Sequence, residues 1–536
     1  MSLPPQDSEI ESSERYSRSE FAEREVSDDP NDVDFLDGDP TKTDTSTSSD
    51  SPFFIPNLTY TREEEAKIIR TLDTRLFPWV LLTTFVLNMD RTNLSNAVSD
   101  NLPADLGFNT DTVNLAVSIY SILFSFSCLA GAVVCKIVHP ARWIPFTMFC
   151  WGLVTMSHAL ITNKGGFLTV RCMIAITEGG VIPATLIYLG SFYKGTELAT
   201  RLGWFWGVQT IASAVSGLMA SGLLQLQGVA GLEGWKWLFL IDGIITVVIS
   251  ILTWFYLPRN STLTKGGIRG WKPWFSEKEV RIAVTRIVRD DPSKRDYESR
   301  VQWSDVKDAA TDIGLWGHLI ITTIGLTPTT PLSIYLPSVI KSFDFSVYVA
   351  NALTAPPYVL QCCTMIACVW HSDRIRERGY HGAFAAAWQL VGWIFLRVLP
   401  ADANKGVKYL AALVVASWPF THPLNIAWMS ENTGQVWSLS GDLASGCVIF
   451  AANIYGVWGS QIYQASDAPD YLTGNTINIA FAATALCLWF VQKFYYAYRN
   501  RRNIELYSKL SEEGKRREEM IVGEKGNRSL LFKFTT

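Results

Sequence analysis

Twelve long apolar runs, divided six and six by a hydrophilic stretch, constrain the fold of this chain more than any other feature of its sequence. A helix needs about 20 consecutive apolar residues to cross the ~30 Å hydrocarbon core of a bilayer. The runs have about that length and lie at 77–97, 112–134, 142–162, 166–192, 201–226, 235–257, 314–339, 347–370, 380–398, 405–428, 437–463 and 473–497. This order predicts an all-α membrane protein with 12 transmembrane helices in two six-helix bundles.

The hydrophilic stretches set the boundaries between regions. Charged residues make up 18% of the sequence, against 48% hydrophobic residues, and they gather outside the apolar runs. We expect a disordered acidic cytosolic tail, an N-terminal bundle, a cytosolic central loop, a C-terminal bundle and a cytosolic tail, at 1–72, 73–258, 259–313, 314–497 and 498–536. The first region is rich in Ser, Thr and acidic residues, which favours a solvated tail over a docking segment.

Basic residues lie mostly in alternate loops. They follow the second, fourth and eighth runs, occur in the central loop and begin the C-terminal tail. Examples in that order are Lys136, Arg201, Arg374, Arg289 and Arg499. Two loops do not fit this pattern. Lys405 and Lys408 lie beside a loop predicted to be outside, and the loop at 429–436, predicted to be inside, has no Lys or Arg. Because cytoplasmic loops carry an excess of Lys and Arg, both termini are predicted to be cytosolic. The plasma membrane is the expected location.

No pattern for soluble catalysis stands out in the sequence. It has no Gly-rich phosphate loop, no His-Glu-x-x-His and no Gly-x-Ser-x-Gly. The nine cysteines lie in or beside apolar runs without the spacing of a metal site. We therefore expect neither an enzyme nor a cofactor, metal or nucleic-acid partner, and we expect membrane lipid to surround the chain.

Four charged residues within the predicted helices stand out: Asp90 and Arg91 in the first, Arg171 and Glu178 in the fourth. At 1.5 Å per residue, Asp90 lies ~20 Å from the inner end of its helix and Arg171 ~7 Å from the outer end of its own. These two side chains come out at nearly the same depth, where they could pair, and Glu178 lies nearer the midplane. Intramembrane charges mark transport pathways more often than they stabilise a fold, although a clasp between helices is the alternative.

A carboxylate beside an arginine in a low-dielectric cavity has a proton affinity that depends on whether the arginine is engaged elsewhere. An anionic substrate that takes the arginine leaves the carboxylate easier to protonate. One such site would therefore link the uptake of an anion to the uptake of a proton.

Several segments resemble one family. MDRTNLSNAVSDNL resembles the first-helix signature of the anion:cation symporter family of the major facilitator superfamily, and RCMIAITEGGVIPATLIYL is similar to its fourth-helix signature. RIVRDDPSK, GWKWLFLIDG and SQIYQASDAPDYLTGN resemble segments of the fungal allantoate permease group.

The resemblance implies a major facilitator fold and proton-coupled transport of organic anions, with relatives that handle allantoate, nicotinate, pantothenate, biotin or sulfate. It implies that Asp90 and Glu178 are the protonatable pair and that Arg91 and Arg171 handle the small anionic substrate. A monomer is the state expected from the family.

The resemblance also implies a gating motif. HSDRIRERG keeps Asp373, Arg374 and Arg378 of the family's Asp-Arg-x3-Arg-Gly pattern after the eighth run. The copy after the second run has Cys135 and Lys136 where the superfamily has Asp-Arg, so a charge lock is not expected from that copy.

Other polar residues within the runs are weaker candidates. Gln209, Tyr335, His422 and Asn453 lie at depths where they could bind substrate, although each alone is more typical of helix packing. Asp242 in the sixth run is either a second titrating group or a partner of Lys236, and both interpretations stay open.

The sequence thus predicts a secondary active transporter for proton-coupled uptake of a small organic anion by alternating access. Three alternatives remain: an exporter of a specialised metabolite anion, a sulfate transporter, and a nutrient-sensing receptor on a transporter scaffold.

Overall fold

A computed structural model describes residues 53–290, 311–400, 402–432 and 449–536, and all statements below concern these residues. Every regular element in them is a helix, as the predicted all-α fold requires. The N-terminal part of the predicted tail and the residues at 437–448 of the eleventh apolar run lie outside the described ranges.

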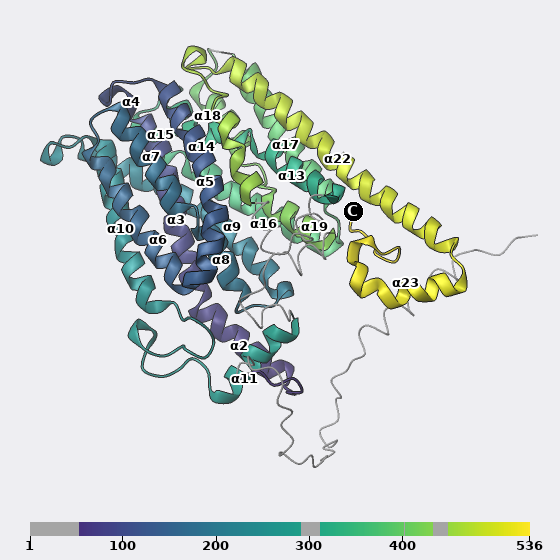
Figure 1. The fold of residues 1–536 in the computed structure, drawn as a ribbon. Coiled ribbons are helices and arrows are strands. Elements are labelled where there is room, and N and C mark those ends of the chain that lie inside the picture. The colour runs from purple at the N-terminus through teal and green to yellow at the C-terminus, as the bar shows by residue number, and fades with distance from the viewer. Residues whose placement is uncertain (1–52, 291–310, 401, 433–448) are drawn as a thin grey trace, which may run out of the picture. The chain divides into compact units, whose positions relative to one another are not determined.

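The first half of the chain supplies α2 (Arg62–Arg75), α3 (Phe77–Ser99), α4 (Leu102–Asp105), α5 (Thr110–Val138), α6 (Pro140–Ser157), α7 (Lys164–Glu178), α8 (Val181–Gly190), α9 (Gly195–Leu223), α10 (Gly234–Tyr256) and α11 (Glu277–Asp290). The second half supplies α13 (Ile313–Leu326), α14 (Thr329–Lys341), α15 (Val347–Ala352), α16 (Ala355–Ile375), α17 (Gly379–Val398), α18 (Lys405–Ala416), α19 (His422–Asn432), α21 (Gly456–Gly459), α22 (Leu472–Ser508) and α23 (Glu512–Lys525). In Figure 1, α10 and α22 lie on opposite sides of the helices between them.

Seven described helical segments are long and apolar enough to cross a membrane, at 110–135, 164–190, 200–226, 234–256, 313–341, 347–375 and 472–508. The first apolar run, which forms α3, is not among them, because it includes several polar and charged side chains. The all-α membrane fold is therefore confirmed, and the count of 12 spans remains a prediction.

Breaks divide several of the long segments. α7 ends at Glu178 and α8 begins at Val181, with Gly179 and Gly180 between them. A Cβ atom on Gly180 would lie 3.0 Å from the Cα atom of Gly131 on α5, so a side chain there would push the two backbones apart. The close approach of α5 to this break is what requires glycine.

The predicted disorder of residues 1–72 is wrong for its last part, because residues 62–75 form α2. Thr61 caps this helix, with its hydroxyl group accepting from Glu64 N and the Glu64 carboxylate accepting from Thr61 N. Ile68 and Leu72, four residues apart on one face, are buried in the core of the first half. The acidic composition of the tail hid this short amphipathic pattern.

α2 also contacts the central hydrophilic region. Lys67 pairs with Glu279 of α11 at 2.8 Å, and Lys278 of α11 pairs with Glu64 at 2.5 Å. The region between the bundles thus includes a helix that packs on α2.

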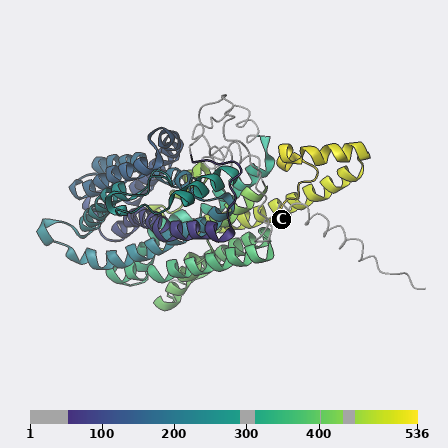
Figure 2. The ribbon, with the colours of Figure 1, turned by 90° about the horizontal axis from the view of Figure 1, so that it is seen from below.

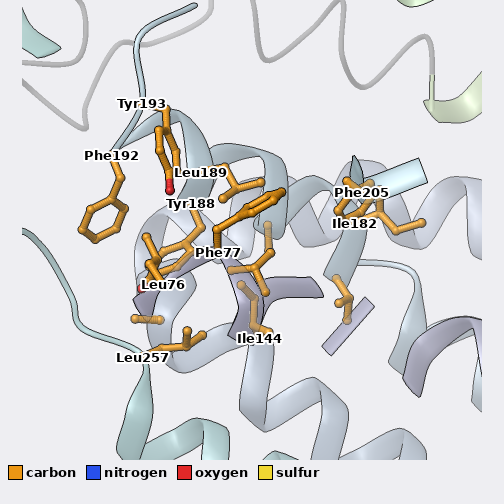
Figure 3. Close-up of a cluster of buried hydrophobic side chains, with 14 of the residues drawn as sticks. Leu76, Phe77, Ile144, Ile182, Tyr188, Leu189, Phe192, Tyr193, Phe205 and Leu257 are labelled. Carbon is orange, nitrogen blue, oxygen red and sulfur yellow. The ribbon is translucent and has the colours of Figure 1, made fainter. Parts of the chain in front are cut away.

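Figure 3 shows part of the core beside α2. Leu76 and Phe77 at the start of α3, Tyr188 of α8 and Leu257 directly after α10 are all buried. The Tyr188 hydroxyl group donates to the carbonyl oxygen of Pro258 at 2.8 Å, which ties α8 to the end of α10.

α22 continues beyond the helices beside it and leads to α23 (Figures 1 and 2). The residues after α23 return to the second half, where Phe534 stacks on Tyr496 of α22 at 5.2 Å. The side-chain amide of Asn500 donates to the Phe534 carbonyl oxygen and accepts from Phe534 N, both at 2.8 Å. This segment therefore packs on α22.

Hydrogen bonds join the two halves at the end of the helices that carries residues 99–110, 342–347 and 460–472, which we call the loop face. Asn114 Nδ2 donates to the Tyr463 carbonyl oxygen at 2.6 Å, and the Ser118 hydroxyl group donates to the Val457 carbonyl oxygen at 2.8 Å. Lys341 Nζ donates to the Ser99 carbonyl oxygen at 2.8 Å.

The opposite end of the helices carries residues 138–140, 190–195, 257–277 and 375–379, and we call it the termini face. The described ion pairs there join elements of the same half. Arg201 pairs with Asp73 of α2 at 2.5 Å, and Arg378 pairs with Glu431 of α19 at 2.6 Å. Within the described residues, the polar contacts thus hold the halves together at the loop face.

The contact between Gly217 of α9 and the turn between α15 and α16 provides a test of this closure. A Cβ atom on Gly217 would lie 2.1 Å from Thr354 Oγ1 and 2.7 Å from the Asn351 carbonyl oxygen. We expect Gly217→Ala to destabilise the protein by about 1–3 kcal/mol, because the two halves must separate locally. The midpoint of thermal denaturation of the purified protein measures this effect.

Gly222→Ala is the matched control. Gly222 lies on the same helix, and no atom lies within 4 Å of its added Cβ atom. Both substitutions improve helix propensity equally, so only the contact differs between them. Equal denaturation midpoints for the two variants would contradict the tight approach at Gly217.

Candidate functional site

A cavity of about 320 Å³ lies between the two halves. Its volume falls within the range of small-molecule sites, roughly 300–1,000 Å³. Its lining from the first half comes mainly from α3, α5, α7 and α9, and from the second half it comes from α14, α16 and the residues around 416–420 and 453–456. Both halves therefore contribute to one candidate binding site.

One wall of this cavity carries charge. Arg91 of α3 forms an ion pair with Glu178 at the end of α7, through Nε and Oε1. The hydroxyl group of Tyr120 on α5 donates to Glu178 Oε2 at 2.9 Å. Both oxygens of this buried carboxylate are therefore satisfied, one by a cation and one by a neutral donor.

Arg171 lies beside this pair without a carboxylate of its own. Its guanidinium group is 4.9 Å above the Tyr120 ring, and the residue is 7% exposed. Its Nε atom is buried without a hydrogen-bond partner, and no ion pair of the described residues includes Arg171. A positive charge and an unused donor thus lie at the cavity wall.

Two further donors at this cavity are buried and unused. They are Arg91 Nη2 and Gln209 Nε2, and both residues line the cavity together with Arg171. Buried donors without partners are costly, so a ligand with acceptor oxygens would satisfy them.

The predicted pairing of Asp90 with Arg171 is wrong. Asp90 Oδ2 instead accepts from Trp151 Nε1 of α6 at 2.7 Å and from Thr246 Oγ1 of α10 at 3.1 Å. Residue spacing gave the height of Asp90 along α3 but not the direction of its side chain. Asp90 faces α6 and α10, whereas Arg91, one residue later and about 100° around the helix, reaches Glu178.

The pairing of Asp242 with Lys236 is likewise not found in the described residues. Lys236 pairs with Glu233 at 2.7 Å, and Asp242 accepts a hydrogen bond from Asn93 of α3. Asp242 is fully buried among α3 and α10. Its possible role as a titrating group therefore remains.

Aromatic side chains also line the cavity. They come from α9, α16 and the second half around α18 and α21, and they are Trp206, Tyr358, Trp418, Phe420 and Tyr455. The Trp206 and Phe420 ring centroids are 6.4 Å apart. The cavity thus has both a charged and an aromatic lining.

The weaker candidates divide into two groups. Gln209 and Asn453 line the cavity, and Asn453 Nδ2 donates to the Ile449 carbonyl oxygen at 2.7 Å. His422 is not among the lining residues, although its ring lies 4.9 Å from that of Trp206, which does line the cavity. His422 therefore reaches the cavity only through the Trp206 ring.

Tyr335, which we predicted to contact substrate, does not line the cavity. Its hydroxyl group donates to Asn114 Oδ1 at 2.5 Å, at the loop face. Its ring stacks against Tyr471 at 6.1 Å. The aromatic residues after α21 hold the Tyr335 ring between the halves, which the sequence of α14 alone could not reveal.

The gating motif lies at the termini face, with Arg378 at its centre. Arg378 pairs with Asp373 and with Glu431, and its Nη1 atom donates to Ser372 Oγ at 3.1 Å. Arg374 instead lies 5.6 Å above the Trp370 ring. The structure therefore brings Asp373 and Arg378, two of the three predicted gating residues, together. It adds Glu431, which was not a predicted gating residue.

Glu377 forms a second polar cluster beside this motif. Burial alone would raise the pKa of Glu377, but hydrogen bonds from Lys493 at 2.8 Å and from His381 at 2.7 Å hold it below its ordinary value. Since Lys493 belongs to α22, the cluster ties the α16–α17 connection to the last long helix.

The first half has charge pairs at the same face despite its altered motif. Arg286 of α11 is fully buried and pairs with Glu197 of α9 at 2.7 Å. Arg201 pairs with Asp73. Sequence reasoning missed these pairs because their acidic partners lie far away in the chain.

Comparisons with known proteins agree with this architecture. A model of the Major Facilitator Superfamily matches residues 80–460. An uncharacterized transporter of Saccharomyces cerevisiae is 30% identical over 484 residues, which cover 90% of this chain and 89% of that protein. The MFS-type transporter cnsO of Penicillium expansum is 30% identical over 478 residues, 87% of this chain and 90% of the relative.

A solved structure shows the same fold. It is that of a bacterial homolog to the human lysosomal transporter Spinster in an inward-facing and occupied conformation, with a TM-score of 0.57 at 13% identity over 78% of this chain and 96% of that one. Together with the helical architecture and a central cavity lined by both halves, these matches show that the chain belongs to the major facilitator superfamily of membrane transporters.

Proposed function

We propose that this secondary transporter takes up a small organic anion together with protons by alternating access. The observation that carries the proposal is the Arg171 guanidinium group, which lies buried at the cavity with an unused Nε donor and no carboxylate partner. Arginine in such a position suits a planar carboxylate, which accepts two parallel hydrogen bonds.

The aromatic lining of the cavity supports an organic substrate. Trp206, Trp418 and Phe420 offer apolar area that sulfate cannot use, whereas the carbon skeleton of an organic anion would pack there. A carboxylate near Arg171 and an apolar part near Trp418 and Phe420 would therefore place the substrate in contact with both halves.

Glu178 supports coupling to protons. Its charge is now balanced by Arg91 and stabilised by the Tyr120 hydroxyl group. An anion that draws Arg91 and Arg171 toward itself would leave Glu178 with less compensation, and a proton would then replace the lost cation. Asp90, at the edge of the same cavity, is the second protonatable group of the proposal.

Two features support alternating access and the orientation. The halves are joined at the loop face, which suits a state whose cavity opens toward the termini face. The basic residues of the central loop and of the α16–α17 connection support a cytosolic termini face. On this basis we propose that both termini are cytosolic. We further propose the plasma membrane as the location and a monomer as the working unit.

The first test is binding. We expect small carboxylates to stabilise the purified protein against thermal denaturation more strongly at about pH 5 than at about pH 7, because ligands that bind only the folded state raise its stability. We expect Arg171→Gln to weaken this binding roughly 10- to 100-fold, because hydrogen bonds to a charged group contribute about 1.5–3 kcal/mol.

The matched control is Arg397→Gln. Arg397 on α17 donates to Thr476 Oγ1 at 3.0 Å and does not line the cavity. Its substitution should leave the carboxylate response unchanged. A response confined to sulfate would favour the sulfate alternative, and a response confined to cationic or neutral compounds would overturn the anion proposal.

The second test is coupling. In vesicles at zero membrane potential, we expect an inward proton gradient to drive accumulation of a carboxylate identified in the binding test. Glu178→Gln should still exchange this anion across the membrane but should accumulate none against its gradient, because the amide cannot take up the proton. Uptake of the radiolabelled anion measures both properties.

Glu233→Gln is the control for this experiment, because Glu233 also pairs with a cation, Lys236 at 2.7 Å, but does not line the cavity. If Glu178→Gln accumulates the anion as well as Glu233→Gln does, Glu178 has no part in coupling.

A further inference from the structure

Two buried carboxyl groups lie next to each other behind the charged wall of the cavity. Thr246 of α10, one turn after Asp242, donates to Asp90 of α3, and Asn93 of α3, one turn after Asp90, donates to Asp242. These reciprocal hydrogen bonds place both carboxyl groups at the same crossing of α3 and α10. Asp90 is 9% exposed and lines the cavity, whereas Asp242 is 0% exposed and does not. Asp90 therefore lies between Asp242 and the space that a substrate would occupy.

Neutral donors satisfy one oxygen of each carboxyl group. Asp90 Oδ2 accepts from Trp151 and Thr246, and Asp242 Oδ2 accepts from Asn93 Nδ2. The Oδ1 atoms of both groups are buried, and neither has a donor among the residues that the structure describes. Each carboxyl group thus has one oxygen atom, Oδ1, that is buried without a hydrogen bond.

Cations do not compensate this pair in the described ranges. Neither Asp90 nor Asp242 takes part in an ion pair there, and Arg91, the residue after Asp90, is engaged with Glu178. Two carboxylates this close together in a low-dielectric interior cannot both be ionised. A proton between the two Oδ1 atoms would remove one charge and supply the missing donor.

The titratable and charged groups around the pair come from α3, α5, α7 and η1 (His158–Leu160), and they are Arg91, Tyr120, Arg171, Glu178 and His158. His158 stacks on Phe239, one turn before Asp242 on α10, at 4.1 Å. The neighbouring polar groups of α6 and α9 are those of Trp151 and Ser216, which do not titrate.

We propose that Asp90 and Asp242 form a proton-binding site in which two carboxyl groups share one proton, separate from the anion site at Arg171. Protons reach the site from the cavity through Asp90. With one shared proton, the charges of Arg91 and Arg171 balance those of Glu178 and the carboxyl pair, so an arriving anion brings the next proton. Only this last role, in transport, rests on the proposed function.

Infrared difference spectroscopy of the purified protein in lipid, without any substrate, tests the site. We expect the C=O stretching band of a buried protonated carboxyl group that persists at about pH 7, where ordinary carboxyl groups are ionised. Asp242→Asn should abolish this band, and so should Asp90→Asn, because the amide then donates the hydrogen bond that the shared proton supplied. The double variant should match the single variants.

Two controls separate this site from its neighbours. Glu178→Gln should retain the band. Asp105→Asn should retain it too, since Asp105 accepts from Trp235 Nε1 at 2.9 Å, much as Asp90 accepts from Trp151, but lies exposed at the loop face.

The possible outcomes distinguish the two proposals. A band that survives in Asp242→Asn but not in Asp90→Asn would overturn the shared site, as would a band lost only in Glu178→Gln or no band in the wild type. If Asp242→Asn does not fold, Asn93→Ala takes its place, because Asn93 donates to Asp242 and not to Asp90. The shared site then requires that Asp90→Asn abolishes the band and that Asn93→Ala shifts its frequency, and an unshifted band would overturn it. Since no anion is present, failure of carboxylate binding in the earlier test leaves this result unaffected.

Discussion

The ion pair between Arg91 and Glu178 is the interaction on which the rest of the cavity depends. It joins α3 to the end of α7 within the interior, where a lone charge is expensive. Glu178 takes Arg91 on one oxygen and Tyr120 on the other, and Arg171 makes no described ion pair with it. Arg171 lines the cavity, where its guanidinium group can bind a negatively charged ligand.

The position of Glu178 follows from the break after it. α7 stops at Glu178, and two glycines lie between it and α8 where α5 approaches closely. A continuous helix with larger side chains would hold α5 and its Tyr120 farther away. The same packing that brings the helix backbones together thus brings a hydroxyl group to the carboxylate, so the fold and the chemistry of the site share one cause.

Much of this arrangement could be predicted from the sequence. Apolar runs gave the helical membrane fold, and the rarity of charge within them singled out Asp90, Arg91, Arg171 and Glu178, all of which line one cavity. Spacing could not give the partners of each charge, because depth along a helix says nothing of how neighbouring helices are rotated. Asp90 therefore turned out to face Trp151 and Thr246 rather than Arg171.

Long-range contacts explain the remaining differences. Tyr335 lies at a plausible depth, but residues more than a hundred positions away in the chain hold it at the loop face. α2 was hidden within an acidic segment because only two buried residues, Ile68 and Leu72, reveal its packed face. Helices of this kind depend on tertiary contacts, and composition averaged over a long tail conceals them.

The hydrogen bonds at the loop face have a consequence for how the protein changes state. Those of Asn114 and Ser118 run from neutral donors to backbone oxygens, and Lys341 also donates to a carbonyl group. The two neutral bonds contribute about 1 kcal/mol each and depend little on salt, and the bond from the charged Lys341 contributes about 1.5–3 kcal/mol. The free energy of breaking these bonds is then comparable to the difference in binding free energy that one small ligand can have between the two access states. In the proposed mechanism, bonds this weak allow the binding of cargo and protons to shift the balance between the two states.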